Sequence, residues 1–426
     1  MALSFTGGVD LQKNRRAPAG KIKLLPAPEY IKLDFSYLRG AVFKSELKEG
    51  DAAAKYQKIG ELSYDGVTMP VYSGISGRIR SFSGDPGAYT GVTVVSEGDM
   101  RAETHGIDKT LAELSAEEVI AALQTYPVMC RGSYADVSGK IAAYGGNAAR
   151  FVLNFCESEP GVSSRKAVCA DDIEAVLGGA KLLMKALDVR KCDIAVEKEC
   201  RTAIKALKEK LGRDPLFDIR RIKGKYPADE EVALIYAVQG VRLSDASHPE
   251  RSGCAVFDAE TAAAVYRAVV YGIPYCERVV TVDSENVLCP IGTPAVELLD
   301  FCRCSTDRIS KLLSGGPMRG KQLKNIEDTT DATTDALTVI YTFDGHPIPE
   351  MSECTRCGKC VNVCPSHILP FRIAELSRKK KYDECAGYGA AACCECGCCD
   401  YVCPAYIPVK RLIRTAKRRA SDSRGE

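Results

Sequence analysis

Apolar and polar positions alternate in short segments over the first hundred residues, with turn-forming sequences between them. The sequences KEGD, SYDG and SGDPG separate these segments. Alternation with a period of two, bounded by Gly, Asp and Ser, is typical of β strands joined by tight turns. The pattern therefore predicts a small β domain over residues 1–105.

The middle of the chain alternates between apolar strands and amphipathic helices. FVLNF (151–155), CDIAVE (192–197) and RVVTVD (278–283) are apolar runs of strand length. Apolar positions instead recur at helical spacing in the segments 171–187, 200–212, 230–240 and 261–272. Strand–helix alternation of this length predicts an α/β core. We place this core at residues 106–285 and a small mixed domain at residues 286–345.

The segment 346–426 has helical patterns around two cysteine-rich runs. FRIAELSRKKKYDE (371–384) has helical periodicity, and residues 407–423 predict a short basic helix with a polar tail. The cations of that helix are Lys410, Arg411, Arg414, Lys417, Arg418 and Arg419. Such a helix face is either simply solvated or docks to an acidic partner or a lipid surface.

The two cysteine runs share one spacing, C-x-x-C-x-x-C-x-x-x-C-P. The first run contains Cys354, Cys357, Cys360 and Cys364, and the second contains Cys393, Cys396, Cys399 and Cys403. In bacterial ferredoxins this spacing holds [4Fe–4S] clusters, and the fourth cysteine of each run ligates the cluster of the other run. We therefore predict two [4Fe–4S] clusters with crossed ligation. One ligand set is Cys354, Cys357, Cys360 and Cys403, and the other is Cys393, Cys396, Cys399 and Cys364.

Two alternatives to clusters are a pair of zinc sites and a disulfide knot. Zinc sites usually combine two C-x-x-C pairs, whereas each run here has three cysteines before a trailing Cys-Pro. Cys394 and Cys398 fall outside the shared spacing. They are either small apolar side chains near a cluster or groups with a redox or alternative-ligand role.

Composition limits the setting in which these thiols work. The chain has 426 residues, 21 cysteines and a net charge of +2, a charge that favours neither a nucleic-acid nor a membrane partner. The N-terminus has no apolar signal region, and no run of 18 apolar residues predicts a transmembrane helix. We therefore expect a reducing, cytoplasmic setting in which cysteines bind metal or carry redox chemistry. The four histidines are scattered and predict no metal site.

Several segments follow one another in the order found in a known family. They are SFTGGVDLQKNR, KEGDAAAKYQKIGE, YSGISGRI, KYPADEEVALIYAVQG, YGIPYCERVVTV, IGTPAVELL and GGPMRG, and the paired cysteine runs close the series. In this respect the chain resembles the C subunit of the Rnf electron-transport complex. The resemblance implies a multidomain α/β protein with small β domains. Its parts would be a lipoyl-like barrel (1–105), a complex I flavoprotein-like α/β core (106–285), a β-grasp, SLBB-like domain (286–345) and a helical two-cluster ferredoxin-type domain (346–426).

The resemblance also implies a function. The protein would be an oxidoreductase subunit that relays electrons between a flavin and pyridine-nucleotide site and a partner, with FMN and NADH as further cofactors. The expected partners are Rnf subunits, ferredoxin or a reductase, with no nucleic acid, and peripheral association with the cytoplasmic face of the cell membrane through partner subunits. One alternative is a soluble, anaerobic paralogue that serves proline reductase or a microcompartment enzyme. Another is a docking scaffold without turnover.

One stretch, NFCESEPGV (154–162), is similar to a motif of the flavin-bearing subunit of complex I. Asn154, Glu157 and Glu159 match that motif, and the resemblance places them at the flavin and nicotinamide site. A strand end followed by polar groups and a turn is where open α/β sheets bind ligands. From the same resemblance, Glu197 and Thr261 are further candidate cofactor-binding residues.

The stretch CRGSYADVSGK (130–140) takes the place of the glycine-rich flavin loop found in that flavin-bearing relative. Gly132 and Lys140 are retained, whereas Ser133, Tyr134 and Ala135 replace the central glycines. Glycines in such loops let backbone N–H groups approach phosphate. An aspartate, Asp258, also replaces an asparagine of the same relative. The sequence therefore leaves two alternatives, a retained flavin site and an altered or vestigial pocket.

Overall fold

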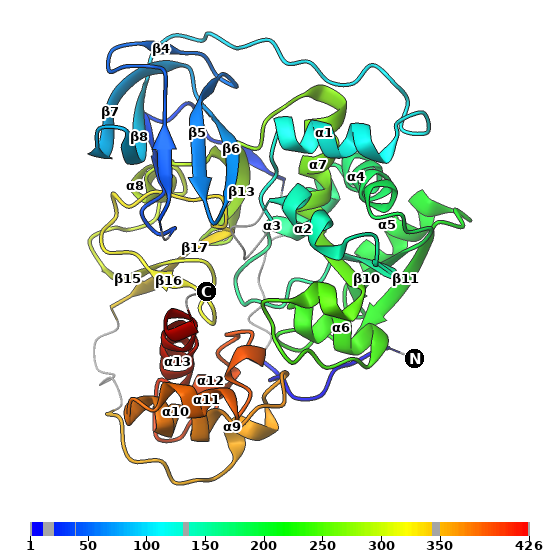
Figure 1. The fold of residues 1–426 in the computed structure, drawn as a ribbon, viewed down its shortest axis with the longest axis vertical. Coiled ribbons are helices and arrows are strands. Elements are labelled where there is room, and N and C mark those ends of the chain that lie inside the picture. The colour runs from blue at the N-terminus through cyan, green and yellow to red at the C-terminus, as the bar shows by residue number, and fades with distance from the viewer. Residues whose placement is uncertain (1, 12–20, 39, 131–135, 343–349, 425–426) are drawn as a thin grey trace.

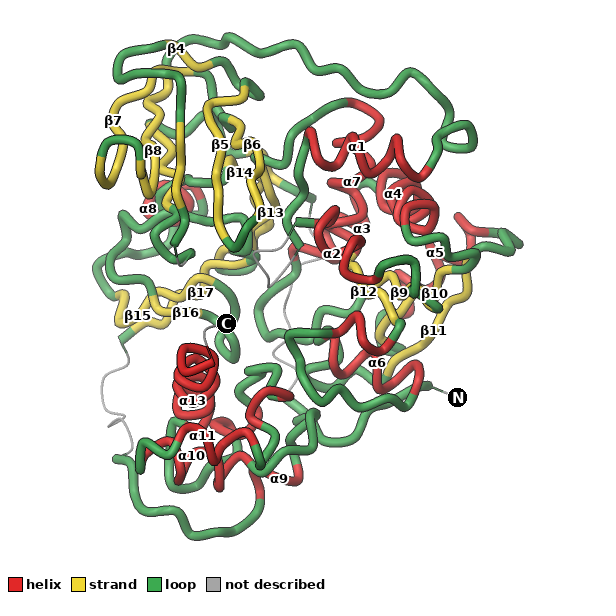
Figure 2. Tube along the Cα trace, in the orientation of Figure 1, coloured by secondary structure: helices red, strands yellow, loops and turns green. Residues whose placement is uncertain are grey.

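The computed structural model describes residues 2–11, 21–38, 40–130, 136–342 and 350–424, with side chains in the last helix up to Ala420 (Figure 1). Across these residues the chain forms three sheets, followed by a C-terminal group of helices (Figure 2). The resulting α/β architecture with additional β regions confirms the predicted fold class.

The first sheet is antiparallel and follows the predicted β pattern. Its order is β4-β7-β8-β3-β5-β6, and β2 also pairs with β8. Ile31, Phe43 and Val92 are fully buried inside it. The strands are β2 Tyr30–Asp34, β3 Val42–Lys44, β4 Ala52–Ala53, β5 Lys58–Tyr64, β6 Val67–Tyr72, β7 Gly77–Asp85 and β8 Ala88–Ser96.

The second sheet is the parallel sheet of the α/β core, in the order β11-β10-β9-β12. Its strands are β9 Arg150–Asn154, β10 Cys192–Glu197, β11 Phe217–Ile222 and β12 Cys254–Asp258. The connecting elements are α1 Ala116–Thr125, α2 Val137–Tyr144, α3 Ser164–Asp171, α4 Ile173–Ala186, α5 Arg201–Leu211, α6 Glu231–Gln239, the short 3₁₀ helix η1 Pro249–Ser252, and α7 Ala259–Tyr271. Helix α1 begins with a capping box formed by Ser115 and Glu118.

The strands of the parallel sheet are apolar on both sides because each face is covered. Phe151 and Leu153 pack with α4 and α7 in one core, whereas Val152 between them packs with α6 in another. Successive side chains of a strand point to opposite faces. This double burial explains why the strand segments are continuous apolar runs rather than alternating ones.

The third sheet is mixed, with the order β1-β14-β13-β17-β15-β16. Its elements are β1 Lys23–Leu24, β13 Glu277–Val282, β14 Glu285–Pro290, α8 Ala295–Phe301, β15 Ile309–Ser314, β16 Lys321–Gln322 and β17 Ala336–Tyr341. The prediction that the strand at 278–283 belongs to the α/β core is therefore wrong. The strand forms as expected, but it pairs with β14 and β17, because apolar periodicity specifies burial and not the neighbouring strand.

The C-terminal helices pack beside the α/β core and below the third sheet (Figure 1). They are α9 Lys359–Asn362, α10 Pro370–Arg378, α11 Tyr382–Ala386, the 3₁₀ helix η2 Ala390–Ala392, α12 Cys398–Tyr401 and α13 Val409–Arg424. The helical segment predicted at 371–384 is broken, because Lys380 adopts a left-handed backbone conformation with φ of 57°. The basic helix predicted from residue 407 is α13, which continues to Arg424 rather than ending early.

The N-terminal segment, residues 2–11, lies on the α/β core and not in the β domain to which the sequence assigned it. The N–H groups of Leu3 and Val9 donate to the carbonyls of Arg221 and Tyr226, both at 2.8 Å. The N–H of Gly8 donates to the carbonyl of Val363 at 2.8 Å. The segment therefore joins the α/β core to the cysteine-rich helices.

Candidate functional site

The cysteines of the first predicted ligand set surround one cavity. Cys354, Cys357, Cys360 and Cys403 line a space of about 100 Å³ beside α9 and α10. Cys403 comes from the other run, so the fold itself brings the crossed ligand to the first three. Cys354 and Cys357 are exposed, and the backbone N–H of Lys359 lowers the pKa of the Cys357 thiol, which favours the thiolate that metals bind.

The second predicted set lies deeper, and the structure brings three of its members together. Cys364, Cys393 and Cys399 belong to one buried core. Cys396 packs instead with Cys398 and Tyr226 in the neighbouring core. Burial raises the pKa of the Cys393 and Cys399 thiols, and bound iron would deprotonate such thiols outright.

The four cysteines of the first set line one cavity, an arrangement that suits a cubane cluster. In the parts of the chain that the structure describes, no three His, Cys, Asp or Glu side chains converge on a point that could hold one metal ion. A cubane spreads its thiolates over four irons, so its ligands lie around a volume and not around a point. The cysteines of the first set likewise lie around a cavity and not around a single point.

Cys394 and Cys398 are expected to be dispensable for iron binding. They break the shared spacing, and Cys398 is buried among apolar neighbours. Replacing both with Ala should leave the iron content at about eight atoms per chain. Iron analysis of the anaerobically purified variant measures this, and a loss of about four irons would contradict the assignment.

The candidate nucleotide site lies at the carboxyl edge of the parallel sheet. Strand order reverses between β9 and β12, and Asn154 and Asp258 end these strands side by side in register. Open α/β sheets bind ligands at such a switch point. Of the predicted site residues, Asn154 ends β9, Glu197 ends β10, Glu157 and Glu159 follow β9, and Thr261 lies in the first turn of α7 after β12. Gly132 and the replaced glycines at 133–135 lie outside the described residues.

The side chain of Lys140 reaches β12 at this sheet, but its ammonium group is already paired with Glu231. Its Nζ donates to Glu231 Oε1 at 2.9 Å and to the carbonyl of Val256 at 2.8 Å. It also lies 4.9 Å from the centre of the Phe257 ring. A phosphate would therefore have to compete with Glu231 for this cation.

Asn154 and Glu157 are buried and bind the backbone around them. Asn154 Nδ2 donates to the carbonyl of Asp229 at 2.9 Å. The carboxylate of Glu157 accepts from the N–H groups of Arg165 and Lys166 at 3.0 and 3.1 Å, at the start of α3. A carboxylate at that position satisfies helix N–H groups that have no partner within the helix. Both residues shape the turn after β9.

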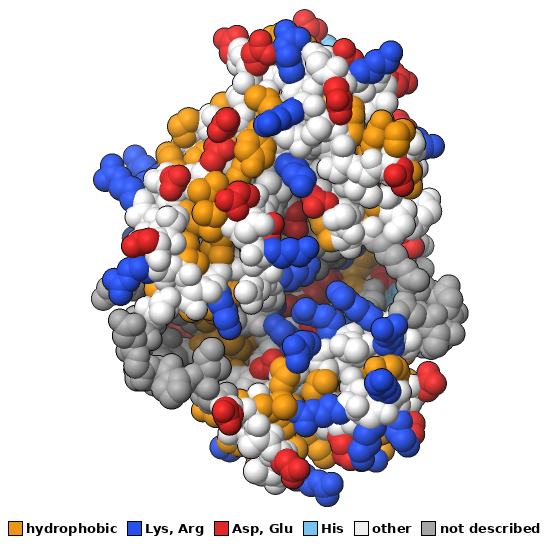
Figure 3. All heavy atoms as spheres, turned by 90° about the vertical axis from the view of Figure 1, so that its left-hand side faces the viewer, with side chains coloured by type: hydrophobic (Ala, Val, Ile, Leu, Met, Phe, Trp, Pro, Cys, Tyr) orange, Lys and Arg blue, Asp and Glu red, His pale blue; other side chains and the backbone are white. Residues whose placement is uncertain are grey.

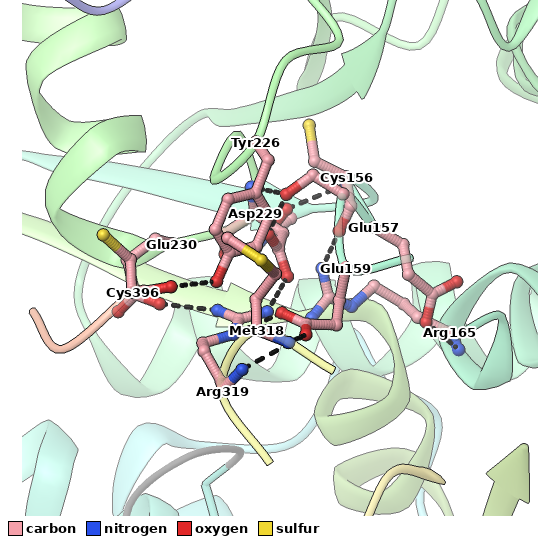
Figure 4. A network of polar contacts seen from close by, with 12 residues as sticks. Cys156, Glu157, Glu159, Arg165, Tyr226, Asp229, Glu230, Met318, Arg319 and Cys396 are labelled. Carbon is pink, nitrogen blue, oxygen red and sulfur yellow. Dashed lines mark hydrogen bonds and ion pairs between the residues drawn. The ribbon is translucent and has the colours of Figure 1, made fainter. Parts of the chain in front are cut away.

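Glu159 lies in a network with Arg319, which belongs to the loop between β15 and β16 (Figure 4). Its Oε1 accepts from the Met318 N–H at 2.6 Å, and its Oε2 accepts from Arg319 Nε at 3.0 Å. Arg319 also donates to Asp229 Oδ2 at 2.5 Å and to Glu230 Oε2 at 2.6 Å. One guanidinium therefore serves three carboxylates, and burial raises the pKa of Glu159 and of Glu230.

The loop that carries Arg319 also contacts the second cysteine run. Lys410 Nζ from α13 donates to the carbonyl of Met318 at 2.8 Å. A Cβ added at Gly397 would lie 2.8 Å from that same carbonyl. The hydroxyl of the fully buried Tyr226 donates to the carbonyl of Cys396 at 2.6 Å. The carboxyl edge of the sheet and the second cysteine run are therefore in direct structural contact.

The described residues near the sheet edge fit a phosphate poorly. Asp258 accepts from the N–H of Thr261 at 2.8 Å, and so caps α7. Asp136 caps α2 by accepting from the N–H groups of Ser138 and Gly139. Helix N-termini attract phosphate, but each of these ends already holds a carboxylate. Glu197, at the end of β10, is also buried and lies 3.6 Å from Lys166 Nζ.

Sequence reasoning missed Arg319, Asp229 and Tyr226 as parts of this site. The segment GGPMRG served only as one marker of the family resemblance, although it contains Arg319. A charged residue within a glycine-rich turn is a signal that could have singled it out. Its three carboxylate partners are distant in sequence, so no spacing rule would have identified them.

Two cubane-type cysteine runs beside a doubly covered parallel α/β core define an iron–sulfur electron-transfer protein with a flavoprotein-type core. Family models agree, because the Nuo51 FMN-binding domain matches residues 137–267 and the 4Fe-4S binding domain matches residues 347–369. The chain belongs to the family of C subunits of the Rnf, or ion-translocating oxidoreductase, complexes.

The relatives match most of the chain. It is 30% identical over 379 residues to the C subunit of the Na⁺-translocating ferredoxin:NAD⁺ oxidoreductase complex of Acetobacterium woodii, covering 85% of this chain and 84% of the relative. It is 29% identical over 399 residues to the proton-translocating counterpart of Clostridium ljungdahlii, covering 90% and 86%. A chain of an NAD⁺-reducing [NiFe]-hydrogenase superposes with a TM-score of 0.46 at 13% identity, covering 74% of this chain and 62% of that one.

These comparisons confirm the predicted family, the electron-transfer role and the iron–sulfur domain, and they do not favour the soluble paralogue. Redox subunits of such a complex are the partners that the family implies. Within the residues described, no helix has the length and apolar character needed to cross a bilayer.

Proposed function

We propose that this chain relays electrons between the carboxyl edge of its parallel sheet and a redox partner, through the second cluster and then the first. The observation that carries this order is the contact between Tyr226 and Cys396, which ties the second run to the sheet edge. The first run is at the other end of the relay, with Cys354 and Cys357 exposed. Two relatives of this chain are named as subunits of ferredoxin:NAD⁺ oxidoreductase complexes. Their names support NADH as the two-electron partner.

The ligand assignment is part of this proposal. Cys354, Cys357, Cys360 and Cys403 would hold the first, outer cluster. Cys393, Cys396, Cys399 and Cys364 would hold the second, inner cluster. The clusters supply one-electron carriers whose potentials depend on local charge, hydrogen bonds to sulfur and burial.

The proposed setting is the cytoplasmic face of an ion-translocating membrane complex. The experiment is anaerobic purification from native membranes, followed by iron analysis and an absorption spectrum. We expect about eight irons per chain and co-isolation with the membrane subunits. Isolation as a soluble protein bound to a reductase would instead favour the paralogue. Absence of both flavin and NADH oxidation would favour the docking scaffold.

Flavin binding at the sheet edge is proposed as weak. The match to an FMN-binding domain and the polar groups at the switch point support binding. The carboxylate caps at Asp136 and Asp258 and the pairing of Lys140 with Glu231 oppose tight binding of the phosphate.

Replacing Asp258 with Asn is expected to tighten FMN binding. Asparagine keeps the cap on α7, because its side-chain oxygen can also accept from the N–H of Thr261. Loss of one negative charge near the phosphate should lower the Kd roughly tenfold at low salt. Anaerobic titration with FMN, followed by flavin fluorescence, measures the change.

The matched control is Asp214→Asn, which lies before β11 at the opposite, amino edge of the sheet. It accepts from the N–H of Leu216 at 3.0 Å, so the substitution changes the same charge without approaching the switch point. If both variants gained the same affinity for FMN, the gain would come from the overall charge and not from the position of Asp258. If neither wild type nor Asp258→Asn binds FMN, the pocket is vestigial.

A further inference from the structure

The outer cysteine set lies on a surface with an unusual combination of residues. Met351 and Tyr406 are 55% and 57% exposed, and the N–H of Ser352 donates to the carbonyl of Ala405 at 3.0 Å. These two apolar side chains therefore flank the same strip of surface, next to the exposed Cys354 and Cys357. Tyr and Met are enriched at protein interfaces.

Cations surround this strip. Arg356, Lys359 and Arg378 line the outer cysteine cavity and are exposed. Lys380 continues the positive charge at the end of α10, whereas Lys381 pairs with Glu384 at 2.7 Å. We call the surface formed by Met351, Cys354, Arg356, Cys357, Lys359, Arg378 and Tyr406 the outer-cluster face.

Acidic groups near the face offset part of its positive charge. Glu375 also lines the cavity, but it pairs with Arg372 and Lys379, each at 2.9 Å. Glu353 precedes Cys354 and is exposed. The whole segment 346–426 carries 14 Lys and Arg against 9 Asp and Glu, whereas the rest of the chain carries 44 against 47. Lys and Arg side chains also gather around a hollow in the lower half of the molecule (Figure 3).

We propose that the outer-cluster face docks an acidic, cluster-bearing electron-transfer protein. The inference rests on the proposed relay, because exposed cluster ligands bring an electron carrier within close reach of a bound partner. A lipid surface would match the charge but would accept no electron. A second copy of this chain would present the same positive charge and be repelled. Complementary charge speeds such encounters by a factor of ten to a thousand.

The test is stopped-flow reduction of the anaerobically purified full-length protein by a pre-reduced acidic bacterial ferredoxin with two [4Fe–4S] clusters. The first variant is Arg356→Gln with Lys359→Gln. The second variant is Arg378→Gln with Lys380→Gln. These residues are distant from the cysteine ligands in sequence, so the second variant still tests the proposal if the first one loses iron. We expect each pair to lower the bimolecular rate constant about threefold to tenfold at low salt, with the difference vanishing near 0.5 M salt.

The control pair is Arg201→Gln with Lys208→Gln, two exposed cations on α5 of the α/β core. It removes the same charge and should leave the rate close to wild type. Iron content and reduction by dithionite are measured for every variant. Failure of dithionite to reduce the wild-type clusters would refute the proposed relay itself.

Other outcomes refute only the docking face. One is a rate that does not depend on salt or on either face variant. Another is an equal loss in the control pair. Loss of binding to anionic phospholipid vesicles in the face variants, with unchanged ferredoxin rates, would assign the face to a lipid surface. Self-association that the face variants abolish would assign it to a second copy.

Discussion

Replacing Cys403 with Ser is expected to remove the cluster that Cys354, Cys357 and Cys360 hold, and not the cluster of its own run. Cys403 lines the cavity of the first run, so its loss leaves that cluster with three thiolates. By the same reasoning, Cys364→Ser should remove the inner cluster, because Cys364 packs with Cys393 and Cys399. Each single variant should lose about four irons per chain.

Double variants distinguish crossed from uncrossed ligation by iron counting alone. Cys357→Ser with Cys403→Ser damages one cluster twice, so about four irons should remain. Cys357→Ser with Cys364→Ser damages both clusters, so little iron should remain. The reverse pattern would show that each run keeps its own fourth cysteine. Cys385→Ala is the control, because this buried thiol lies between the runs and donates to the carbonyl of Lys381 at 3.4 Å.

Replacing Arg319 with Gln is expected to destabilise the protein by roughly 3–5 kcal/mol, because it leaves buried carboxylates without their cation. Glu159 and Asp229 are almost inaccessible to solvent, at 3% and 5% exposure, and Arg319 donates to both. Anaerobic thermal unfolding measures the loss. The matched control is Arg372→Gln, whose pair with Glu375 is near the surface and should matter by at most about 1 kcal/mol.

The pH dependence of this loss has a definite sign. Burial raises the pKa of Glu159 and of Glu230 even with Arg319 present, so the folded state holds their protons more strongly than the unfolded chain does. Stability from these groups therefore falls as pH rises above the ordinary glutamate pKa of about 4.3. The deficit of Arg319→Gln should be larger at pH 8 than at about pH 5. A deficit that is constant with pH, or that the double variant with Glu159→Gln does not reduce, would contradict this account.

The positions of several elements followed from local pattern. The run CDIAVE is β10 without a shift in either boundary. The cysteine spacing C-x-x-C-x-x-C-x-x-x-C-P predicted cubane clusters, because three thiolates of one tight loop must reach three irons of one cube. The order of short motifs indicated the family, which the relatives confirm.

Contacts between distant segments were decided only by the tertiary structure. The apolar patterns of residues 2–11 and of the strand β13 are compatible with more than one sheet. In the structure, residues 2–11 pair with the α/β core and β13 pairs with β17. Glu159 matched a flavin-site motif, yet its carboxylate forms an ion pair with Arg319, a residue distant in sequence. Sequence by itself predicted the apolar strands, several helices and the cysteines expected to bind iron, since these signals lie in near neighbours along the chain. The spacing of the two runs already predicted that Cys403 joins the first run, whereas the pairing of Glu159 with Arg319 depends on long-range packing that no local period encodes.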